Sequence, residues 1–505
     1  MTDDFEGSSE REDGLSPSAK DRRSGPQRRT KIVATIGPAS TTPESLKALL
    51  AAGVDVVRLN LSHGSIEEHL QRLALVRTIA AELGKIVAVL ADLPGPKVRA
   101  GAFSSDGVQL VEGSGSVLVV GSTSSSAERI EVDYPTLLSD LSPGDRIVVG
   151  DGAITARVIT VDTNGAHITL LTGGRVAGRP GVHLPSTRLR LTTPTERDLR
   201  YAVQMAEAGA DFLAVSFVRS GADLDRVREA IAGSPHKPLL VAKIETTQAV
   251  DNLVGIVAKS DAVMVARGDL GIDCDLADVP HIQKRIIRKC VEDGVPVITA
   301  TQMLETMITA PTPTRAEVSD VANAVFDGTD AVMLSGETAV GHDPALVVRT
   351  MGEICRRAEE QASYRQWATR LGRVQRRDQS PDQRTRLTVA LTHAAWQAAE
   401  DAQVAAIVCC TRSGATARAM ARYKPLAQLI AASPSLATVR ALALSWGVTS
   451  MLIGEQHSAD DMIWVAVEQA ARTSLVAKGE TVVAVAGTRP DSGAPVDVIR
   501  MIEIQ

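Results

Sequence analysis

The chain has 505 residues, of which 44% are hydrophobic and 23% charged, and its formal net charge is −6. The length allows about three domains of ordinary globular composition. The negative charge argues against a general nucleic-acid-binding protein, and no apolar run reaches the ~18 residues of a membrane span, so neither nucleic acid nor a membrane is an expected partner.

The first segment, residues 1–29, is predicted to be a disordered tail. It mixes charges with Ser, Gly and Pro, and it lacks the apolar core of a secretory signal. The five cysteines of the whole chain show neither CxxC spacing nor a matching His array. Zinc sites and disulfides are therefore disfavoured, and a cytoplasmic location is expected.

Eight short apolar runs follow the tail, with helical stretches between most of them. Continuous apolar runs are typical of parallel strands that are covered on both faces. The pattern predicts an α/β fold with a (β/α)8 TIM barrel over 30–95 and 186–345, whose chemistry should lie at the carboxyl ends of the strands. The runs are 31–37, 55–61, 86–92, 211–218, 239–245, 262–269, 296–303 and 331–337.

The connection after the third strand is much longer than the others and is predicted to be a separate domain. Residues 96–185 contain short strands with turn signals at intervals of about 8–12 residues, which predicts a small β-barrel inserted into the TIM barrel. Pro94, Gly95 and Pro96 form the outgoing connection, and residues 183–186 form the return. Two connections stiffened by proline favour a hinged lid over the barrel mouth.

A third domain is predicted over residues 346–505. Its Arg-rich segment at 370–386 is expected to be an exposed loop of unassigned role. Helices and strands then alternate from residue 387 to a last strand near residue 497. This order is typical of an open α/β domain.

Polar side chains at the ends of barrel strands carry the predicted chemistry. Lys243 and Glu245 are two residues apart on one strand and so point the same way, and Asp269 ends the next strand. Two carboxylates at neighbouring strand ends can share Mg2+, and the Lys243 ammonium can neutralise a transferring phosphoryl group or an enolate. The alternative is a purely structural Lys–Glu pair.

Other strand ends supply groups that bind anions. Arg58 offers a cation for phosphate, and Thr301 offers a hydroxyl. The glycine-rich stretch at Gly268 predicts exposed backbone amides at the start of a helix, where a carboxylate can bind. His63 fits a ligand contact and a hydrogen-bonded turn histidine equally well.

Seven motifs, taken in order, resemble the signatures of pyruvate kinases. The resemblance covers about residues 30–505, and it includes a β-domain inserted after the third barrel strand. It implies transfer of the phosphoryl group of phosphoenolpyruvate to ADP, giving pyruvate and ATP, as the last step of glycolysis in a homotetramer. The motifs are TKIVATIGPAS (30–40), VVRLNLSHG (56–64), KIE (243–245), MVARGDLG (264–271), ATQMLETM (300–307), PTRAEVSDVANAV (313–325) and VMLSGETAVG (332–341).

The resemblance also assigns roles to individual residues. Glu245 and Asp269 would hold the divalent metal, Mg2+ or Mn2+, and Asp269 would also contact the substrate. Lys243 would stabilise the transition state and, with Arg58, grip the phosphoryl group. Gly268 and Thr301 would bind the substrate carboxylate, with Thr301 also on the route that protonates enolpyruvate. The nucleotide would face Asn60, His63, Arg99, Pro38 and, by a loose match to a lid lysine, Arg179.

The segment that begins at Asp92 departs from the pattern of pyruvate kinases that require K+. In those enzymes the ion takes oxygens from the residues that match Asn60, Ser62, Asp92 and Leu93. Here Lys97 replaces a glutamate, and Leu93 and Ala100 replace threonines. The chain resembles the K+-independent branch, so we expect the Lys97 ammonium to replace the ion, with Asp92 as its partner. The alternative is a solvated hinge lysine.

A loop in the third domain is the predicted effector site. Hydroxyls and free amides between a strand and a helix can bind phosphate, although ordinary helix capping fits them equally well. In the family, this loop resembles the allosteric pocket, which a late loop matching 487–495 completes. The ligand could be fructose 1,6-bisphosphate, another sugar phosphate or AMP. The residues are Thr411, Arg412, Ser413, Gly414, Thr416 and Arg489.

Two rival functions fit parts of the sequence. A barrel lyase that forms a pyruvate enolate on Mg2+ would need neither the lid nor the residues that face ADP. A degenerate metabolite sensor should have lost Lys243, Glu245 or Asp269, and all three are present. The sequence therefore favours a Mg2+-dependent pyruvate kinase that is regulated by a phosphorylated metabolite.

Overall fold

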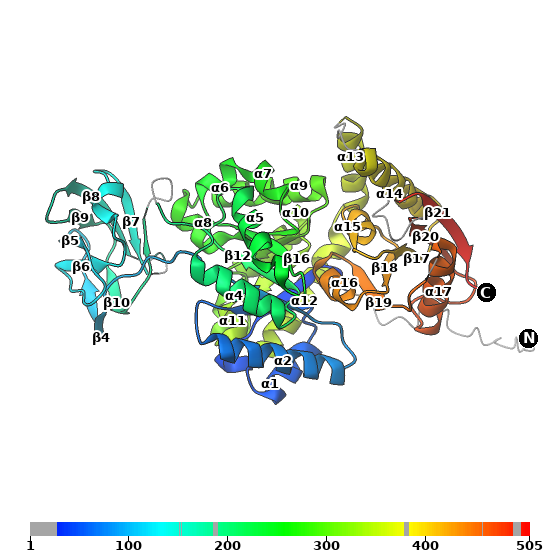
Figure 1. The fold of residues 1–505 in the computed structure, drawn as a ribbon, viewed down its shortest axis with the longest axis horizontal. Coiled ribbons are helices and arrows are strands. Elements are labelled where there is room, and N and C mark those ends of the chain that lie inside the picture. The colour runs from blue at the N-terminus through cyan, green and yellow to red at the C-terminus, as the bar shows by residue number, and fades with distance from the viewer. Residues whose placement is uncertain are drawn as a thin grey trace, which may run out of the picture.

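The computed structural model describes residues 28–150, 152, 154–184, 190–377, 383–456, 458–487 and 496–505. Three domains lie in a row along the longest axis of the molecule, and the barrel lies between the lid and the C-terminal domain (Figure 1). The tail predicted at 1–29 lies outside the described residues except for Arg28 and Arg29. Ser186, at the predicted return from the lid, also lies outside them.

Eight parallel strands close into a barrel in the order β1-β16-β15-β14-β13-β12-β3-β2, which confirms the predicted (β/α)8 fold. Their residues are almost all buried, because helices cover the outside and side chains fill the interior. The strands are β1 (Lys31–Thr35), β2 (Val56–Asn60), β3 (Ala88–Asp92), β12 (Phe212–Val215), β13 (Leu239–Ile244), β14 (Ala262–Ala266), β15 (Val297–Ala300) and β16 (Ala331–Leu334).

The barrel helices begin and end at local signals in the sequence. The helix α10 (Arg315–Asp327) starts with a capping box between Thr314 and Glu317 and ends at Gly328, whose φ of +100° suits glycine. The other helices around the barrel are α1 (Pro43–Ala51), α2 (Ile66–Glu82), α4 (Glu196–Glu207), α5 (Gly221–Ala230), α6 (Thr247–Asp251), α7 (Leu253–Val257), α8 (Arg267–Asp273), α9 (Val279–Asp293), α11 (Gly336–Ala339) and α12 (Pro344–Gln361).

The lid is built from short strands around its own apolar core. A six-stranded sheet has the order β11-β7-β8-β9-β5-β6, and β10 pairs with β4 in a second sheet. The strands are β4 (Phe103–Leu110), β5 (Gly115–Val120), β6 (Arg129–Val132), β7 (Arg146–Val149), β8 (Ile154–Val161), β9 (Ala166–Leu170), β10 (Gly174–Gly178) and β11 (Val182–His183), with the single-turn helix α3 (Leu137–Asp140).

The C-terminal domain is an open sheet with helices, as predicted. Its strand order is β19-β18-β17-β20-β21, and only the last pair is antiparallel. The elements are α13 (Tyr364–Arg377), α14 (Gln383–Asp401), β17 (Ala406–Cys410), α15 (Ala415–Ala421), β18 (Gln428–Ser433), α16 (Leu436–Ala441), β19 (Val448–Leu452), α17 (Ala459–Arg472), β20 (Thr481–Ala486) and β21 (Val498–Glu503).

The prediction of an exposed loop at 370–386 is wrong. Helix α13 continues to Arg377 and α14 begins at Gln383, while 378–382 lie outside the described residues. Tyr364, Ala368 and Leu371 are buried at spacings of four and three residues, which is the periodicity of a helix packed on one side. Arginine and glutamine are good helix formers, so the polar composition did not indicate a loop.

The C-terminal domain closes the amino-terminal end of the barrel. Ala443 and Leu444, in the turn η5 (Leu442–Leu444), belong to the same apolar cluster as Val33, Phe212 and the other side chains of the barrel interior. The packing therefore joins the two domains through a shared core. Within the described part of the chain, no helix has both the length and the apolar character needed to cross a membrane.

Candidate active site

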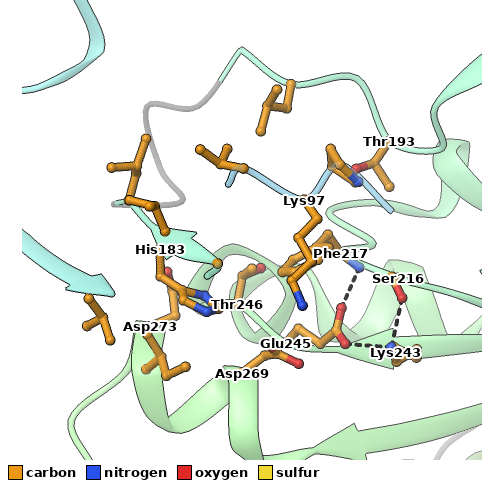
Figure 2. A pocket seen from close by; sticks show the side chains of 18 of the residues that line it. Lys97, His183, Thr193, Ser216, Phe217, Lys243, Glu245, Thr246, Asp269 and Asp273 are labelled. Carbon is orange, nitrogen blue, oxygen red and sulfur yellow. Dashed lines mark hydrogen bonds and ion pairs between the residues drawn. The ribbon is translucent and has the colours of Figure 1, made fainter. Parts of the chain in front are cut away.

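A cavity of about 790 Å3 lies between the carboxyl ends of the barrel strands and the lid. Figure 2 shows side chains from both domains that point into it. Because parallel strands bring their carboxyl ends to one side, polar residues far apart in sequence meet there. The predicted residues that line the cavity are Arg58, Asn60, Ser62, His63, Lys97, Lys243, Glu245 and Asp269.

Lys243, near the end of β13, is the centre of the buried polar cluster. Its Nζ lies 2.8 Å from Oε1 of Glu245 and 3.2 Å from Oδ1 of Asp92. It also donates to the Ser216 hydroxyl at 2.7 Å. The side chains of the two acids are no more than 2% exposed, so the ammonium is fixed between them with little competition from water.

Arg58 of β2 forms the second cationic part of the cluster. Its Nε and Nη2 both lie 2.7 Å from Oδ2 of Asp92, and its Nη1 donates to the Thr35 hydroxyl at 3.0 Å. Burial by itself would raise the pKa of Asp92, but Lys243 and Arg58 hold that pKa below its ordinary value. Asp92 is therefore an ionised buried carboxylate that orients two cations.

The charges of Lys243 and Glu245 differ in how well they are balanced. Burial opposes the Lys243 ammonium, yet Asp92 and Glu245 raise its pKa above the ordinary value. Burial raises the pKa of Glu245, and the nearby Asp269 raises it further against the opposing effect of Lys243. The cluster therefore keeps Lys243 charged, while the pair of carboxylates needs more positive charge than Lys243 provides.

The two carboxylates suit a divalent cation. Oε1 of Glu245 is buried and is paired with the Lys243 ammonium at 2.8 Å. Asp269, at the start of α8, lines the same cavity, and its charge acts on Glu245. Hard cations such as Mg2+ bind carboxylate oxygens and retain positions for water and phosphate. The donor set and its uncompensated charge both fit Mg2+ or Mn2+.

Thr301 and Gly268 meet beside this cluster, as predicted for a carboxylate site. The Gly268 amide at the start of α8 donates to the Thr301 hydroxyl at 2.8 Å. That hydroxyl lies 2.6 Å from the Ala300 carbonyl, to which it donates. The amide and the hydroxyl thus lie side by side after β14 and β15, and both donate their protons within the chain. Neither residue is among those that line the main cavity in the described structure.

The predicted residues of the nucleotide site are only partly brought together. His63 and Lys97 line the cavity, and burial followed by the charges of Lys97, Arg99 and Arg58 lowers the pKa of His63. Arg99 instead donates to the backbone carbonyl of Arg179 at 3.1 Å, within the lid. These charges nevertheless make this side of the cavity suitable for phosphate groups.

Arg179 and Pro38 lie apart from the other predicted nucleotide residues. The Arg179 guanidinium forms an ion pair with Asp133 of the lid at 3.2 Å, with both side chains exposed. Pro38 is exposed at the start of the turn η1 (Pro38–Ser40). Neither is among the described residues that line the cavity. The sequence pattern does not give the position of the lid, so it could not fix these contacts.

The positions expected to bind K+ are occupied by contacts within the chain. Oδ1 of Asn60 accepts the Ser62 amide at 3.2 Å, and the Leu93 carbonyl accepts the Ser216 hydroxyl at 2.8 Å. Among the described residues, the ion pairs of Asp92 are with Arg58 and Lys243 and not with Lys97, so the expected Asp92–Lys97 pair is wrong.

The Lys97 ammonium instead points into the cavity toward Glu245 and Asp269 (Figure 2). Its side chain passes the lid glycine Gly181 on the way. Lys97 therefore brings a fixed positive charge to the same cavity, but from the lid side. The sequence predicted the wrong partner for this charge, because the pairing depends on how the connection to the lid directs the chain.

Ser216 and Phe217 were missed by the sequence analysis. They follow β12, and Phe217 has a φ of +54°. The Phe217 amide donates to Oε2 of Glu245 at 2.6 Å, while Ser216 links Lys243 to the Leu93 carbonyl. The same signal used for the other strands could have found Ser216, since it is the polar residue that directly follows the apolar stretch Phe212–Val215 of the fourth run.

The predicted effector loop lies between β17 and α15. The Thr411 hydroxyl accepts the Gly414 amide at 2.9 Å, and the Arg412 guanidinium pairs with Glu455 at 2.8 Å. The Thr438 hydroxyl of α16 donates to the Arg412 carbonyl at 2.6 Å. Ser413 is exposed and Thr416 is buried, and Arg489 lies outside the described residues. The loop thus leads into α15 and is hydrogen-bonded to α16.

Comparisons with known proteins agree over almost the whole chain. The family model "Pyruvate kinase, barrel domain" matches residues 27–348, and "Pyruvate kinase, alpha/beta domain" matches 389–502. The chain is 42% identical over 466 residues to a pyruvate kinase of Geobacillus stearothermophilus, covering 91% of this chain and 78% of that protein.

A second relative and a solved structure extend the same result. Identity to a pyruvate kinase of Methylorubrum extorquens is 41% over 460 residues, covering 91% of this chain and 94% of that protein. The crystal structure of a pyruvate kinase from Cryptosporidium parvum matches with a TM-score of 0.86 at 31% identity, covering 95% of this chain and 97% of that one.

Proposed function

The chain belongs to the pyruvate kinase family, and on that premise we propose that its cavity binds phosphoenolpyruvate and ADP and yields pyruvate and ATP. The observation that carries the proposal is the buried cluster in which Lys243 lies between Glu245 and Asp92, with Arg58 on the far side of Asp92. Phosphoryl transfer depends mainly on positioning and charge neutralisation, which this cluster provides.

We assign the divalent metal to Glu245 and Asp269. Mg2+ or Mn2+ bound there would supply Lewis-acid stabilisation of the phosphoryl and carboxylate oxygens. The support is the position of the buried Glu245 carboxylate in one cavity with Asp269, and the raised pKa that burial and Asp269 give Glu245. Among the described residues, no group of three or more His, Cys, Asp or Glu side chains is arranged to hold a metal, so the protein offers two carboxylates here.

The residues around the metal position then divide the substrate between them. Lys243 and Arg58 carry fixed charges and neutralise the phosphoryl group as its bond to the enol oxygen lengthens. The substrate carboxylate takes over the hydrogen bonds that the Gly268 amide and the Thr301 hydroxyl otherwise make within the chain. Thr301 also lies on the route by which a proton reaches the methylene carbon of the enolpyruvate. Asn60, His63 and Arg99, together with the less securely matched Pro38 and Arg179, serve the nucleotide.

We further propose that turnover needs no K+. Asp92 already has two cationic partners, and the Lys97 ammonium adds a fixed charge to the cavity where a monovalent ion would otherwise act. Lys97 therefore replaces the ion through its charge, without an ion pair to Asp92.

A coupled assay of pyruvate formation from phosphoenolpyruvate and ADP tests the reaction directly. We expect activity with Mg2+ or Mn2+ and none after removal of divalent ions by a chelator. Glu245→Gln should lower kcat by about 100-fold or more and weaken activation by Mg2+, because the amide keeps the shape but lacks the charge. Wild-type turnover in this variant would contradict the assignment.

We also propose regulation by a phosphorylated metabolite at the loop of Thr411, Arg412, Ser413, Gly414 and Thr416, and assembly as a homotetramer. Calorimetry with fructose 1,6-bisphosphate, glucose 6-phosphate and AMP tests the loop. At least one should bind, and Ser413→Asp should abolish its heat by placing a negative charge beside the phosphate. No heat with any of them would contradict the effector site, and sedimentation velocity tests the tetramer.

A further inference from the structure

The backbone that carries the Thr301 hydroxyl has an unusual conformation. Thr301 and Gln302 follow β15 with φ values of +68° and +53°, both in the left-handed region. A positive φ in a β-branched residue is a genuine outlier. Two such residues in succession persist only where surrounding contacts hold them.

Arg267 provides those contacts. Its Nε donates to the Ala300 carbonyl at 3.1 Å, and its Nη2 donates to the Thr301 carbonyl at 2.6 Å. These are consecutive carbonyls, and the planar guanidinium presents donors in a fork that can hold both at once. The Arg267 side chain is only 10% exposed, so water competes weakly for these hydrogen bonds.

The guanidinium is itself held from the opposite side. Its Nη1 lies 2.8 Å from Oδ2 of Asp320 on α10 and donates to Oε1 of Gln283 on α9 at 3.3 Å. Charge-assisted hydrogen bonds of this kind are the stronger ones in proteins. Two barrel helices thus fix Arg267, and Arg267 fixes the turn after β15.

The result of this arrangement is the position of one hydroxyl. With the backbone held in this way, the Thr301 hydroxyl accepts the amide of Gly268, the residue next to Arg267 in the chain, at 2.8 Å. Arg267 is not among the described residues that line the cavity. Any effect of Arg267 on the substrate is therefore indirect.

We propose that Arg267 is a positioning residue for catalysis, which keeps Thr301 in its left-handed conformation so that the hydroxyl stays beside the Gly268 amide. The proposal rests on the proposed role of Thr301 in binding the substrate carboxylate and in protonation. Without the guanidinium, the turn relaxes toward negative φ and carries the hydroxyl away from Gly268.

The experiment compares Arg267→Met, Thr301→Ala and their combination in the assay with phosphoenolpyruvate and ADP. Arg267→Met should lower kcat by about 100-fold, with the KM for ADP within about twofold of wild type. The double variant should be no slower than Thr301→Ala, because both changes remove the same positioned hydroxyl. Arg357→Met, at a site that is 67% exposed on α12, is the matched control and should keep wild-type kinetics.

A rescue variant separates positioning from a merely structural role. Glycine accepts a positive φ without cost, so Gln302→Gly added to Arg267→Met should raise kcat at least about tenfold. In the wild-type background, the same change should alter kcat by less than about twofold. If Arg267 only held α9 and α10 together, a more flexible turn at residue 302 would not restore kcat.

Each outcome decides between the two ideas. Wild-type turnover of Thr301→Ala would show that the proposed role of Thr301 is wrong, whatever Arg267 does. A low kcat of Thr301→Ala together with a wild-type kcat of Arg267→Met would overturn the positioning role. A double variant whose loss of kcat equals the product of the two single losses would overturn it as well. If Arg267→Met does not fold, Arg267→Lys replaces it, with a loss of about tenfold expected and the same rescue required.

Discussion

At the scale of single residues, the site depends on an unequal distribution of charge. Lys243 has two carboxylates beside it. Glu245 and Asp269 share this one ammonium of the barrel, and the Lys97 ammonium points toward them from the lid side (Figure 2). Burial strengthens this imbalance, because the charges cannot be dispersed into water. The surplus negative charge is what fits the cluster for a divalent cation, and the cations at Arg58, Lys97 and Lys243 fit the remaining cavity for phosphate.

The first prediction at this scale concerns Lys97. Wild-type activity should be unchanged when K+ is replaced by tetramethylammonium at constant ionic strength. Lys97→Glu should lose activity in the absence of K+ and recover much of it when K+ is added. A unit charge at ~4 Å and a dielectric of about 20 contributes about 4 kcal/mol, which sets an upper limit of about a thousandfold.

A matched control for this charge reversal is Lys47→Glu. Lys47 is 53% exposed on α1 and is not among the described residues that line the cavity. Its reversal should leave the kinetics and the salt response unchanged. Loss of wild-type activity in the absence of K+ would disprove the proposal that the Lys97 ammonium replaces the ion.

At the scale of secondary-structure elements, the hinge of the lid packs directly on residues that hold the active site. Gly95 is buried with a φ of +69°, and a Cβ there would lie 2.8 Å from that of Ser216 and 2.9 Å from the Phe217 ring. Phe217 in turn donates its amide to Glu245. The connection to the lid is therefore in contact with the turn that orients Glu245, the carboxylate proposed to bind the metal.

Gly95→Ala should consequently affect the chemistry as well as the stability. The added methyl has no space beside Ser216 and Phe217, so the Phe217 turn must move away from Glu245. We expect kcat or the affinity for Mg2+ to fall by about tenfold or more, with a loss of about 1–3 kcal/mol in unfolding free energy. Steady-state titrations with Mg2+ and thermal unfolding measure these two effects.

Gly84→Ala distinguishes crowding from backbone strain. Gly84 has a φ of +60°, and nothing lies within 4 Å of a Cβ built there. This variant carries a similar strain without a collision, so it should lose some stability and keep its Mg2+ response. Equal kinetic effects in the two variants would argue against the contact between the hinge and the active site.

At the scale of the whole molecule, the barrel and the C-terminal domain share buried polar and apolar groups. The backbone amide of Arg29 donates to Oε2 of Glu359 at 2.9 Å, and the Arg29 guanidinium lies 5.4 Å from the centre of the Trp446 ring. Lys424 donates to the Thr329 carbonyl at 3.3 Å, and its Nζ lies 4.6 Å from the centre of the same ring. The junction therefore contains a buried ammonium.

That ammonium predicts a dependence of stability on pH. Burial lowers the pKa of Lys424 to about 8, against the partial opposing effect of Asp330, whereas the unfolded chain should show about 10.4. Between these values the unfolded state binds more protons, so unfolding free energy rises with pH by at most about 1.4 kcal/mol per unit from this group. Lys424→Met should flatten the rise of the thermal midpoint between pH 8 and pH 10.

The slope is the diagnostic quantity, because Lys424→Met also removes a positive charge near the buried Asp330 and so lowers absolute stability as well. Lys259→Met is the control, since the Lys259 side chain is 55% exposed. It should keep the wild-type slope. Parallel slopes in wild type and Lys424→Met would contradict the assignment of this pH response to the domain junction.

Much of the fold could be predicted because its signals are local. The eight apolar runs and the turn-rich insertion each reflect a short-range pattern of burial, and they gave the barrel and the position of the inserted lid. Lys243 and Glu245 were found because strand periodicity places them on one face. The loop prediction for the Arg-rich segment was wrong because the few buried positions of α13 make a weak local pattern among many arginines.

The sequence by itself determined which residue types stand at the strand ends and therefore which chemistry the barrel mouth can support. Only the tertiary structure decided which charges meet: Asp92 with Arg58 and Lys243 instead of Lys97, Phe217 with Glu245, and Arg267 with the turn at Thr301. The physical reason is that propensity and periodicity act over a few residues, whereas these contacts depend on chain closure and on the direction of side chains brought together from distant strands.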